Sequence, residues 1–356
     1  MIRSLLSADP PGSRLLAASL LAVLVGLALA PFVFPGARSL DVAARVAVFV
    51  LLAASYDLLL GYTGIVSFAH TMFFGIGGYG IGIAAASWGS GWGSLAAGSL
   101  AALACSAAIA FAVGLLSLRV RAIFFAMITL AVAAFFQILA SQMSWLTGGE
   151  DGLNFNLPSV LSPGTKLVAA PVLGIDLNGR VLSYYLVFGC ALALFLVLLR
   201  IVNSPFGRVL LAIRENEFRA EALGYRTVVY RTVANCLGAL AATCAGLLYA
   251  LWLRYTGPAT TLSFDIMIDI LLMVVIGGMG TMYGAVVGAT LFVIAQTYLQ
   301  DLMKFASDAA AGIPLLPSLV HPDRWLLWLG ILFILSVYRF PSGIVGKLRS
   351  KVREKP

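Results

Sequence analysis

Residues 122–142 read AIFFAMITLAVAAFFQILASQ, a stretch without a single charged side chain. A helix needs about 20 consecutive, mostly apolar residues to cross the hydrocarbon core of a bilayer, and this stretch is long enough. The rest of the chain is similar, because 61% of its 356 residues are hydrophobic, 11% are charged and the mean hydropathy is +0.99. Soluble domains average about 25% charged residues, and disordered chains combine high charge with low hydrophobicity. The sequence therefore predicts an all-α, polytopic bundle of transmembrane helices.

Long apolar runs, bounded by charged residues or by Gly and Pro, divide the chain into about ten membrane segments. An outer-membrane barrel would instead alternate apolar and polar residues. The third segment is rich in glycine and is either continuous or broken. The eighth and ninth are separated only by Gly280 and Thr281, so one of them is a candidate re-entrant segment. The predicted segments are 15–34, 42–60, 64–87, 95–117, 122–142, 182–201, 228–253, 264–280, 282–300 and 325–340.

The first segment, 15–34, raises the question of a cleaved signal peptide, because Arg3 and Arg14 precede it and Ala28-Leu29-Ala30 resembles a cleavage site. The apolar core of a signal peptide is about 7–15 residues long, whereas this run has the length of a membrane span. Pro31 would follow the cut directly, where it fits poorly. We therefore expect this segment to be retained as the first span.

The distribution of basic residues predicts the orientation of the chain. An even number of spans places both termini on one side of the membrane, and cytosolic loops carry the excess of Lys and Arg. With cytosolic termini, sixteen of the 23 basic residues lie inside, and the opposite orientation would place these sixteen outside. We therefore predict that both termini are cytosolic. The sixteen residues are Arg3, Arg14, Arg119, Arg121, Arg200, Arg208, Arg214, Arg219, Arg226, Arg231, Arg339, Lys347, Arg349, Lys351, Arg353 and Lys355.

Residues 1–356 are interpreted as a single transmembrane domain with three polar parts. Residues 143–181 are rich in Pro, Gly and Asn, and we expect them to form an extracytoplasmic loop or small cap. Residues 203–228 form a cytosolic loop. Residues 341–356 form a basic cytosolic tail, which is expected to anchor the topology and to contact anionic membrane lipid.

The cytosolic loop reads NSPFGRVLLAIRENEFRAEALGYR over residues 203–226. Ser204-Pro205 suits a helix start, the alternating Arg and Glu of 214–221 suit a short solvated helix, and Gly224 suits its C-terminal cap. Such a helix, lying across the cytosolic face between two spans, can fit a groove on a partner and pass the partner's movements to the membrane. An ordinary charged loop that follows the positive-inside rule explains the composition equally well.

Glu221-Ala222-Leu223-Gly224 resembles the Glu-Ala-Ala loop of ATP-binding-cassette importer permeases, although its glycine follows without the usual three-residue spacer. The wider set of FGR at 206–208, AIRENE at 212–217 and AEALG at 220–224 resembles the permeases of branched-chain amino acid importers, the LivM type in particular. In ATP-binding-cassette permeases this loop forms the coupling helix that docks on the ATPase subunit. The resemblance implies that the ATPase-coupling residues are Arg214, Glu215, Asn216, Glu217, Ala220, Glu221, Ala222, Leu223 and Gly224.

A second resemblance lies in residues 56–79, which read YDLLLGYTGIVSFAHTMFFGIGGY. The same family has the landmarks GYTG, Ser, His, FFGIG and Tyr in this order. Glycines permit close helix packing or a break in a helix, and the half-helix ends at a break offer partial charges to the carboxylate and ammonium groups of an amino acid. Tight packing without ligand contact is the alternative for the glycines, and a satisfied structural histidine is the alternative for His70.

The sequence VVIGGMGTMYGAVVGA at 274–289 resembles a later glycine cluster of the family, and the whole resemblance runs from about Val46 to Phe340. One glycine-interrupted segment in each half fits the repeat logic by which transporters build a central site. The resemblance implies a substrate pathway that includes Tyr62, Thr63, Gly64, Ser67, His70, Phe73, Gly75, Gly77, Gly78, Gly277, Gly278 and Gly280. Asp57 falls near the cytosolic end of its segment, where solvent or a helix-end partner would stabilise it. Asp269 lies deeper in the membrane than Asp265, so leaving its side chain without a partner costs more free energy.

No Walker A sequence, G-x-x-x-x-G-K-[S/T], occurs in the chain, and Gly346-Lys347 is followed by Leu348 instead of Ser or Thr. We therefore expect no directly bound cofactor, and ATP to act through partner ATPase subunits. His70 and His321 are the only histidines, too few for a His-based metal cluster. The residues form no catalytic constellation, so an enzyme is not expected. The net charge of +8 is accounted for by topology rather than by nucleic-acid binding.

The resemblance implies a permease subunit of an ATP-binding-cassette importer for branched-chain or other hydrophobic amino acids, located in the bacterial inner membrane. Its expected partners are a homologous second permease (LivH-like), two ATPase subunits, an extracytoplasmic solute-binding protein and membrane lipid. One alternative is a permease of the same type for urea, amides or other small solutes. A secondary transporter driven by an ion gradient is the other, and it would be expected to show more paired charges within the membrane.

Overall fold

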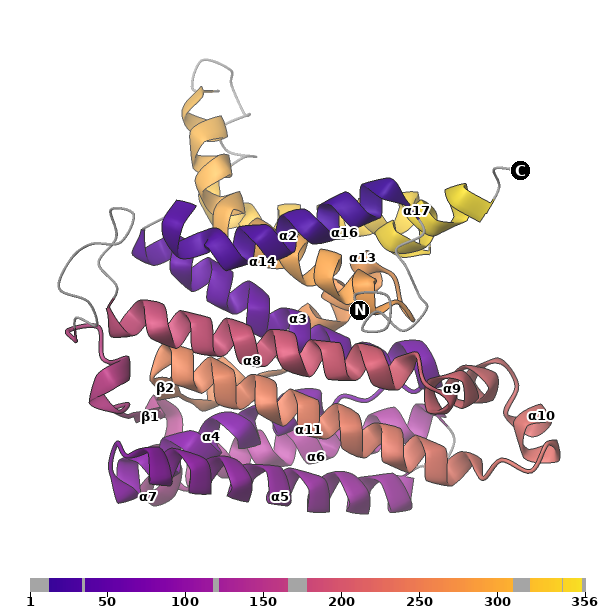
Figure 1. The fold of residues 1–356 in the computed structure, drawn as a ribbon, viewed down its shortest axis with the longest axis horizontal. Coiled ribbons are helices and arrows are strands. Elements are labelled where there is room, and N and C mark those ends of the chain that lie inside the picture. Colours follow the sequence, from indigo (N-terminus) through magenta and orange to yellow (C-terminus); the bar gives the residue numbers. More distant parts are fainter. Residues whose placement is uncertain are drawn as a thin grey trace.

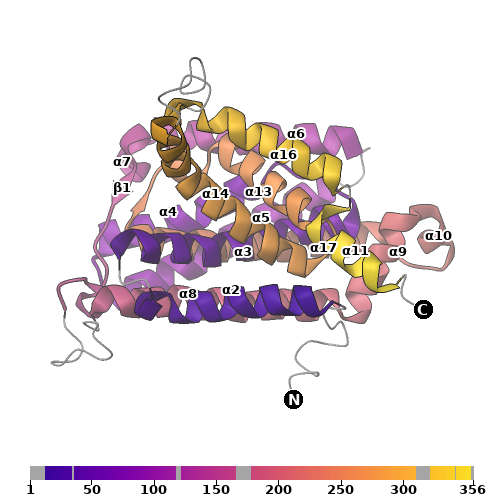
Figure 2. The ribbon, with the colours of Figure 1, turned by 90° about the horizontal axis from the view of Figure 1, so that it is seen from above.

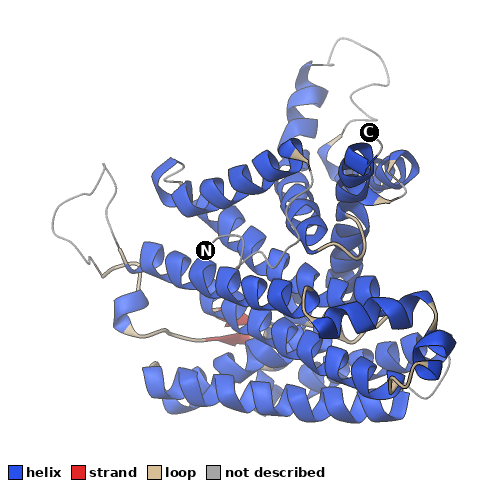
Figure 3. Cartoon of the chain, turned by 45° about the vertical axis from the view of Figure 1, so that its right-hand side comes forward, coloured by secondary structure: helices blue, strands red, loops and turns tan. Residues whose placement is uncertain are grey.

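The computed structural model describes residues 13–33, 36–117, 122–165, 178–309, 321–340 and 342–353. In this part of the chain, nine helices are long and apolar enough to cross a membrane, which confirms the predicted polytopic helical fold. Figure 3 shows how completely helices dominate the molecule. Arg3, Arg119, Arg121, residues 166–177 of the predicted cap and residues 354–356 of the predicted tail lie outside the described residues.

Each of the ten predicted segments coincides with a helix. The glycine-rich helix α4 is the one that falls outside the nine candidate spans, because its glycines and His70 lower its mean hydropathy. The helices are α2 (Arg14–Val33), α3 (Ala37–Thr63), α4 (His70–Trp88), α5 (Trp92–Ser117), α6 (Ala122–Gln142), α8 (Gly179–Val202), α11 (Thr227–Leu253), α13 (Phe264–Gly277), α14 (Met282–Ala309) and α16 (Trp325–Arg339).

Two helix boundaries differ from the prediction in an informative way. The third segment was expected to start at residue 64, but residues 64–69 are irregular and α4 begins only at His70. The eighth was expected to reach residue 280, but α13 ends at Gly277. Gly64 and Gly280 have φ values of 75° and 79°, a left-handed conformation that residues other than glycine rarely adopt and that interrupts a helix. The glycine-rich segments are therefore broken at their ends, next to α3 and next to α14.

Helix α13 is short for a membrane span. At about 1.5 Å rise per residue its 14 residues extend about 21 Å, less than the roughly 30 Å hydrocarbon core. The four-residue helix α12 (Pro258–Thr261) precedes it, and together they make up the candidate span Pro258–Gly277. Helices α13 and α14 pack against each other on either side of the short break, so they form a tight helical hairpin.

Helix α3 runs through the middle of the bundle, where it packs against α8, α11, α13 and α14 (Figures 1 and 2). Twenty of its 27 residues are buried. The Ala and Val residues of 42–54 explain this position, because short side chains let several helices approach the same one. Helix α2 and helix α16 instead expose large apolar side chains, as expected of surfaces that face lipid.

Glycines bring α4 into close contact with its two neighbours. A Cβ atom at Gly77 would collide with the backbone carbonyl of Thr243 in α11, and one at Gly246 of α11 would collide with the carbonyl of Phe74 in α4. Gly80 of α4 and Gly98 of α5 face each other in the same manner. Small residues allow such close backbone approach, which is a main source of attraction between helices in lipid. The glycine content of α4 is thus required for its packing.

The polar elements lie at the two ends of the bundle (Figures 1 and 2). One end carries α9 (Pro205–Glu215), α10 (Glu217–Ala222) and α17 (Gly343–Arg353). The opposite end carries α7 (Ser144–Thr147) and a two-stranded antiparallel sheet of β1 (Leu153–Asn154) and β2 (Tyr255–Thr256). The short helices η1 (Gly149–Asp151) and η2 (Ser159–Leu161) complete this small cap, and η3 (Pro322–Arg324) precedes α16.

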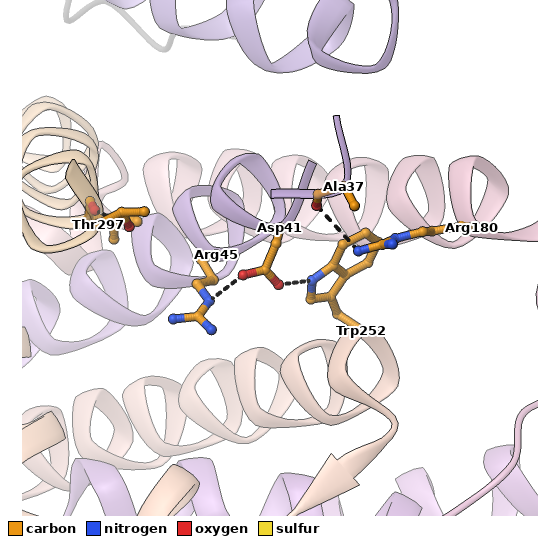
Figure 4. A network of polar contacts seen from close by, with 7 residues as sticks. Ala37, Asp41, Arg45, Arg180, Trp252 and Thr297 are labelled. Atoms are coloured by element: carbon orange, nitrogen blue, oxygen red, sulfur yellow. Dashed lines mark hydrogen bonds and ion pairs between the residues drawn. The ribbon is translucent and has the colours of Figure 1, made fainter. Parts of the chain in front are cut away.

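The cap end is also held by a polar network between helices, shown in Figure 4. Asp41 of α3 pairs with Arg45 at 2.9 Å and accepts a hydrogen bond from the Trp252 indole N–H of α11, also at 2.9 Å. Arg180 of α8 donates to the Ala37 carbonyl at 3.3 Å and stacks over the Trp252 ring. These contacts fix the ends of α3, α8 and α11 relative to one another.

The contact between α4 and α11 can be tested with Gly246→Ala. Because the added methyl group meets the Phe74 carbonyl, we expect a loss of about 1–3 kcal/mol of stability, as for overpacked cores. Gly189→Ala in α8 is the matched control, since nothing lies within 4 Å of its Cβ position. Thermal unfolding of the purified chain in detergent would measure both. An unfolding temperature for Gly246→Ala equal to that of the control would contradict the close contact.

Candidate functional site

The two glycine breaks meet at the end of the bundle that carries α9 and α10. Asp57, one turn and a half before the end of α3, is completely buried at 0% exposure. Its carboxylate accepts a hydrogen bond of 2.8 Å from the backbone N–H of Gly280, in the break between α13 and α14. Of the two expectations for Asp57, a helix-end partner is thus confirmed and solvation is wrong. The hydrogen bond provides a partner for one backbone group that the break leaves without a helical partner.

Gly61 allows this close approach. A Cβ atom at Gly61 would collide with both the Asp57 carboxylate and the backbone nitrogen of Gly280. The same glycine's carbonyl accepts a hydrogen bond from the Arg214 guanidinium, which reaches it from the last turn of α9. A Cβ atom at Gly64 would lie 3.2 Å from the Arg214 side chain. Four segments, distant in the sequence, therefore converge: the end of α3, the residues after it, α9 and the α13–α14 break.

The polar loop that contains Arg214 folds into two short helices. Pro205 occupies the first turn of α9, as the sequence predicts. The predicted single helix over 214–221 is wrong at one residue, because Asn216 is extended, with φ −158° and ψ 100°, and separates α9 from α10. Its side chain accepts a hydrogen bond of 2.9 Å from the Arg219 N–H and so caps the N-terminus of α10. Asparagine is one of the residues preferred at this position. Gly224 follows the end of α10 with a φ of 92°, as expected of a glycine at this position.

The predicted ATPase-coupling residues divide into two groups in the structure. Arg214, Glu217 and Glu221 contact other parts of this chain: Arg214 contacts Gly61, Glu217 forms an ion pair with Arg231 of α11, and Glu221 accepts a hydrogen bond of 2.7 Å from the Thr227 hydroxyl. Ala220 is buried. The outward-facing members are Glu215, Asn216, Ala222, Leu223 and Gly224. None of these placements tests ATPase contact, which stays a prediction.

Phe218 was not among the predicted residues, although it is the most exposed large apolar side chain of the helix pair. Its side chain is 83% exposed, and that of Leu223 is 72% exposed. Both stand among charged residues on the polar end of the bundle. A large aromatic residue in the middle of an Arg- and Glu-rich run was the signal available in the sequence. We call the surface formed by Phe218, Leu223 and the charged residues of α10 the α10 surface.

None of the predicted pathway residues lines either of two cavities of about 500–570 Å³ in the described part of the chain. Phe73 is buried in the core, and Cβ atoms at Gly75, Gly77 and Gly78 would meet Leu262, Thr243 and Thr256, so this group packs α4 against its neighbours. A Cβ at Gly277 would meet Gly284 across the hairpin, and Gly278 and Gly280 form the break. These placements match the packing alternative, but substrate contact itself remains untested.

The remaining pathway residues surround the break after α3. Thr63 donates its hydroxyl to the Leu59 carbonyl at 2.7 Å, and the Ser67 hydroxyl accepts from the Ala69 N–H at 3.3 Å. His70 starts α4 at 1% exposure, with its ring edge-on to Tyr56 at 5.0 Å. Tyr62 lies in the last turn of α3 and is buried. These side chains and Gly64 lie in the irregular segment after α3 or in the helix turns on either side of it.

One cavity of about 570 Å³ lies between α4, α5 and α6 near the cap. It is lined largely by apolar side chains such as Ile76, Ile83 and Leu139, and the predicted pathway residues are not among its lining residues. On α13, Asp265 is exposed, while Asp269 accepts a hydrogen bond of 3.3 Å from Gln296 of α14. Within the described ranges, no three His, Cys, Asp or Glu side chains gather closely enough to hold a metal ion.

Comparison with known proteins gives a consistent result. A family model described as the permease component of the branched-chain amino acid transport system matches residues 38–337. The high-affinity branched-chain amino acid transport system permease protein LivM of Salmonella typhimurium is 26% identical over 321 residues, which are 86% of this chain and 74% of the relative. LivM of Escherichia coli is 26% identical over 81% of this chain and 70% of its own length. A probable LivM of Methanocaldococcus jannaschii is 32% identical over 48% of each chain. No solved structure matches the chain significantly.

The hydrogen bond at the junction predicts different effects for two substitutions of Asp57. Asp57→Ala removes the acceptor of the Gly280 N–H, and an unsatisfied buried group costs about 1–3 kcal/mol, so the unfolding temperature should fall. Asp57→Asn retains a carbonyl oxygen in the same place and should lose less. Thermal unfolding of the purified chain in detergent would compare them. An equal loss for both variants, or none for Asp57→Ala, would contradict the assigned role of this hydrogen bond.

Proposed function

Because this chain belongs to the family of branched-chain amino acid transport system permease components, we propose that it forms the membrane pathway of an ATP-binding-cassette importer for branched-chain or other hydrophobic amino acids. The family match over residues 38–337 is the observation that carries this proposal, since it covers nearly all of the helices of the bundle. Multiple membrane spans are consistent with that role. The match of most of this chain to the LivM proteins of Salmonella typhimurium and Escherichia coli supports a location in a bacterial inner membrane.

In this proposal the chain works with separate subunits. A homologous second permease of the LivH type completes the pathway, two ATPase subunits hydrolyse ATP, and an extracytoplasmic solute-binding protein delivers the amino acid. The chain itself has no Walker A sequence, so the energy of transport enters through contact with the ATPases. Transport then follows alternating access, in which ATP binding closes the ATPases and shifts the permease helices between two arrangements.

The positive-inside rule assigns the two ends of the bundle in this proposal. The basic residues of α9, α10 and α17 lie at one end, which we place in the cytosol. The cap formed by α7, β1 and β2 then faces the solute-binding protein on the other side. Both assignments agree with cytosolic termini.

The α10 surface is the part of the cytosolic end that best fits an ATPase. Large apolar side chains that stand in water mark sites of protein contact, and aromatic residues contribute most to such contacts. Phe218 and Leu223 have this character, and Glu217 and Arg219 flank Phe218 in the sequence. Glu217 and Glu221 hold α10 on α11, so a force applied to the surface reaches a membrane helix directly.

Reconstitution tests the proposed function. Proteoliposomes that contain this chain, the second permease and both ATPases should take up labelled leucine only when ATP and the loaded binding protein are both present. A non-hydrolysable ATP analogue serves as the control and should support no continued uptake. Uptake by this chain alone, driven by an ion gradient, would instead establish a secondary transporter. Uptake of urea but not leucine would assign the substrate to the amide-type permeases.

The α10 surface can be tested with Phe218→Glu. Loss of an aromatic anchor costs about 2 kcal/mol or more at a protein interface, so ATPase binding should weaken about 30-fold. Arg208→Glu is the control, because this residue is also exposed on the helix pair but lies on α9, away from the α10 surface. Co-purification of tagged ATPase with each full-length variant would measure binding. Normal ATPase binding by Phe218→Glu would exclude the α10 surface as the contact.

A further inference from the structure

Arg214 differs from Phe218 and Leu223 in the direction of its contacts. Phe218 and Leu223 point into solvent, whereas the Arg214 guanidinium donates a hydrogen bond to the carbonyl of Gly61 at the end of α3. The residue as a whole remains exposed, and it covers the junction from the cytosolic side. The resemblance to importer permeases placed Arg214 among the ATPase-contacting residues, but the structure directs its charged group toward the membrane helices.

The Arg214 side chain lies across both glycine breaks, with its aliphatic part beside Gly64 and its guanidinium beside Gly280. A Cβ atom at Gly280 would come within 2.9 Å of an Arg214 nitrogen, and one at Gly64 within 3.2 Å of the Arg214 Cγ. Arg214 is also within electrostatic range of the buried Asp57 carboxylate, which holds the Gly280 N–H at 2.8 Å. One side chain therefore contacts the break after α3 and the break before α14 together.

The helix pair is built to move Arg214 as a unit with the α10 surface. The backbone hydrogen bond from Asn216 to Ala212 at 3.0 Å and that from Ala220 to Asn216 at 3.1 Å join the two helices through one residue. The Asn216 side chain caps α10 in addition. Because so short and hydrogen-bonded a connection cannot absorb a displacement, movement of α10 displaces the end of α9 as well.

We propose that Arg214 is the positioning residue through which a displacement of the α9–α10 helix pair reaches both glycine breaks at once. Withdrawal of the guanidinium removes the hydrogen bond to Gly61 and takes a positive charge away from the buried Asp57 carboxyl group, which holds the Gly280 N–H, so the helix pair and the breaks change together. Glycines with positive φ at both breaks supply the hinges, because they tolerate backbone rotation. The role of Arg214 in transport rests on the proposed function. In that function the ATPase displaces α10, and Arg214 passes the displacement to the ends of α3, α13 and α14.

Hydrogen exchange tests the connection without any partner protein. The full-length chain in lipid nanodiscs is compared with Arg214→Gln, which removes the charge and shortens the side chain so that it no longer reaches the Gly61 carbonyl. A hydrogen bond to a charged group stabilises a closed state on the order of tenfold or more, so exchange should accelerate by about that factor at residues 61–69 and 277–284. Arg208→Gln is the matched control on the same helix and should leave both segments unchanged. Faster exchange at only one break, or at neither, would overturn the proposal.

Transport by the assembled importer provides the second measurement. Arg214→Gln should bind the ATPases as the unsubstituted chain does and still hydrolyse ATP, but move far less leucine for each ATP consumed. Arg214→Lys keeps the positive charge and should restore part of that ratio. Loss of ATPase binding would make Arg214 a docking residue, and an unchanged ratio would remove it from coupling, so either result contradicts the proposal. If the unsubstituted complex transports nothing, the proposed function fails while the exchange experiment still decides the connection.

Discussion

The hydrogen bond between the Gly280 N–H and the Asp57 carboxylate makes the broken helices of this protein possible. Water is absent from the hydrocarbon region, so a backbone group that loses its helical partner must find another within the protein. Asp57 supplies that partner from the neighbouring helix, at 2.8 Å and with no exposure to solvent. Gly61 lets the two backbones approach, and Arg214 covers the junction from the polar end. The hairpin of α13 and α14 can therefore end and restart beside α3.

Glycine has two separate functions in this fold. Along α4, Gly77 and Gly80 have no side chain, so the backbones of α11 and α5 can pack directly against the backbone of α4. At the junction, Gly64 and Gly280 adopt left-handed conformations that end regular helix. The first function packs the centre of the bundle closely, and the second allows the helix breaks at the junction. Such a division suits a protein that must change shape in response to a partner without losing its helical packing.

The polar end of the bundle connects this division to the proposed transport cycle. The α10 surface presents Phe218 and Leu223 to the outside, while Glu217 and Glu221 tie the same helix to α11. Inward from it, α9 carries Arg214 to the junction. In the proposed importer the energy for transport comes from separate ATPase subunits, and this series of contacts is the route by which it would reach the membrane helices. The cap at the opposite end is small and braced by the Asp41–Trp252 network, so the two ends are built differently.

The sequence by itself determined the membrane helices, because a run of about twenty apolar residues forms a helix that spans the hydrocarbon core of a bilayer. It also located both glycine clusters and the short polar helix, and it supported the family to which the chain belongs. It misplaced the helix ends at residues 64 and 280 and made one helix of α9 and α10, since Asn216 and the glycines take their conformations from local hydrogen bonds. Only the tertiary structure decided that Gly75 and Gly77 pack helices, that Phe218 faces outward and that Arg214 faces inward. The reason is that periodicity and hydropathy describe each segment alone, whereas Asp57 and Gly280 are 223 positions apart and their contact exists only after the helices have packed.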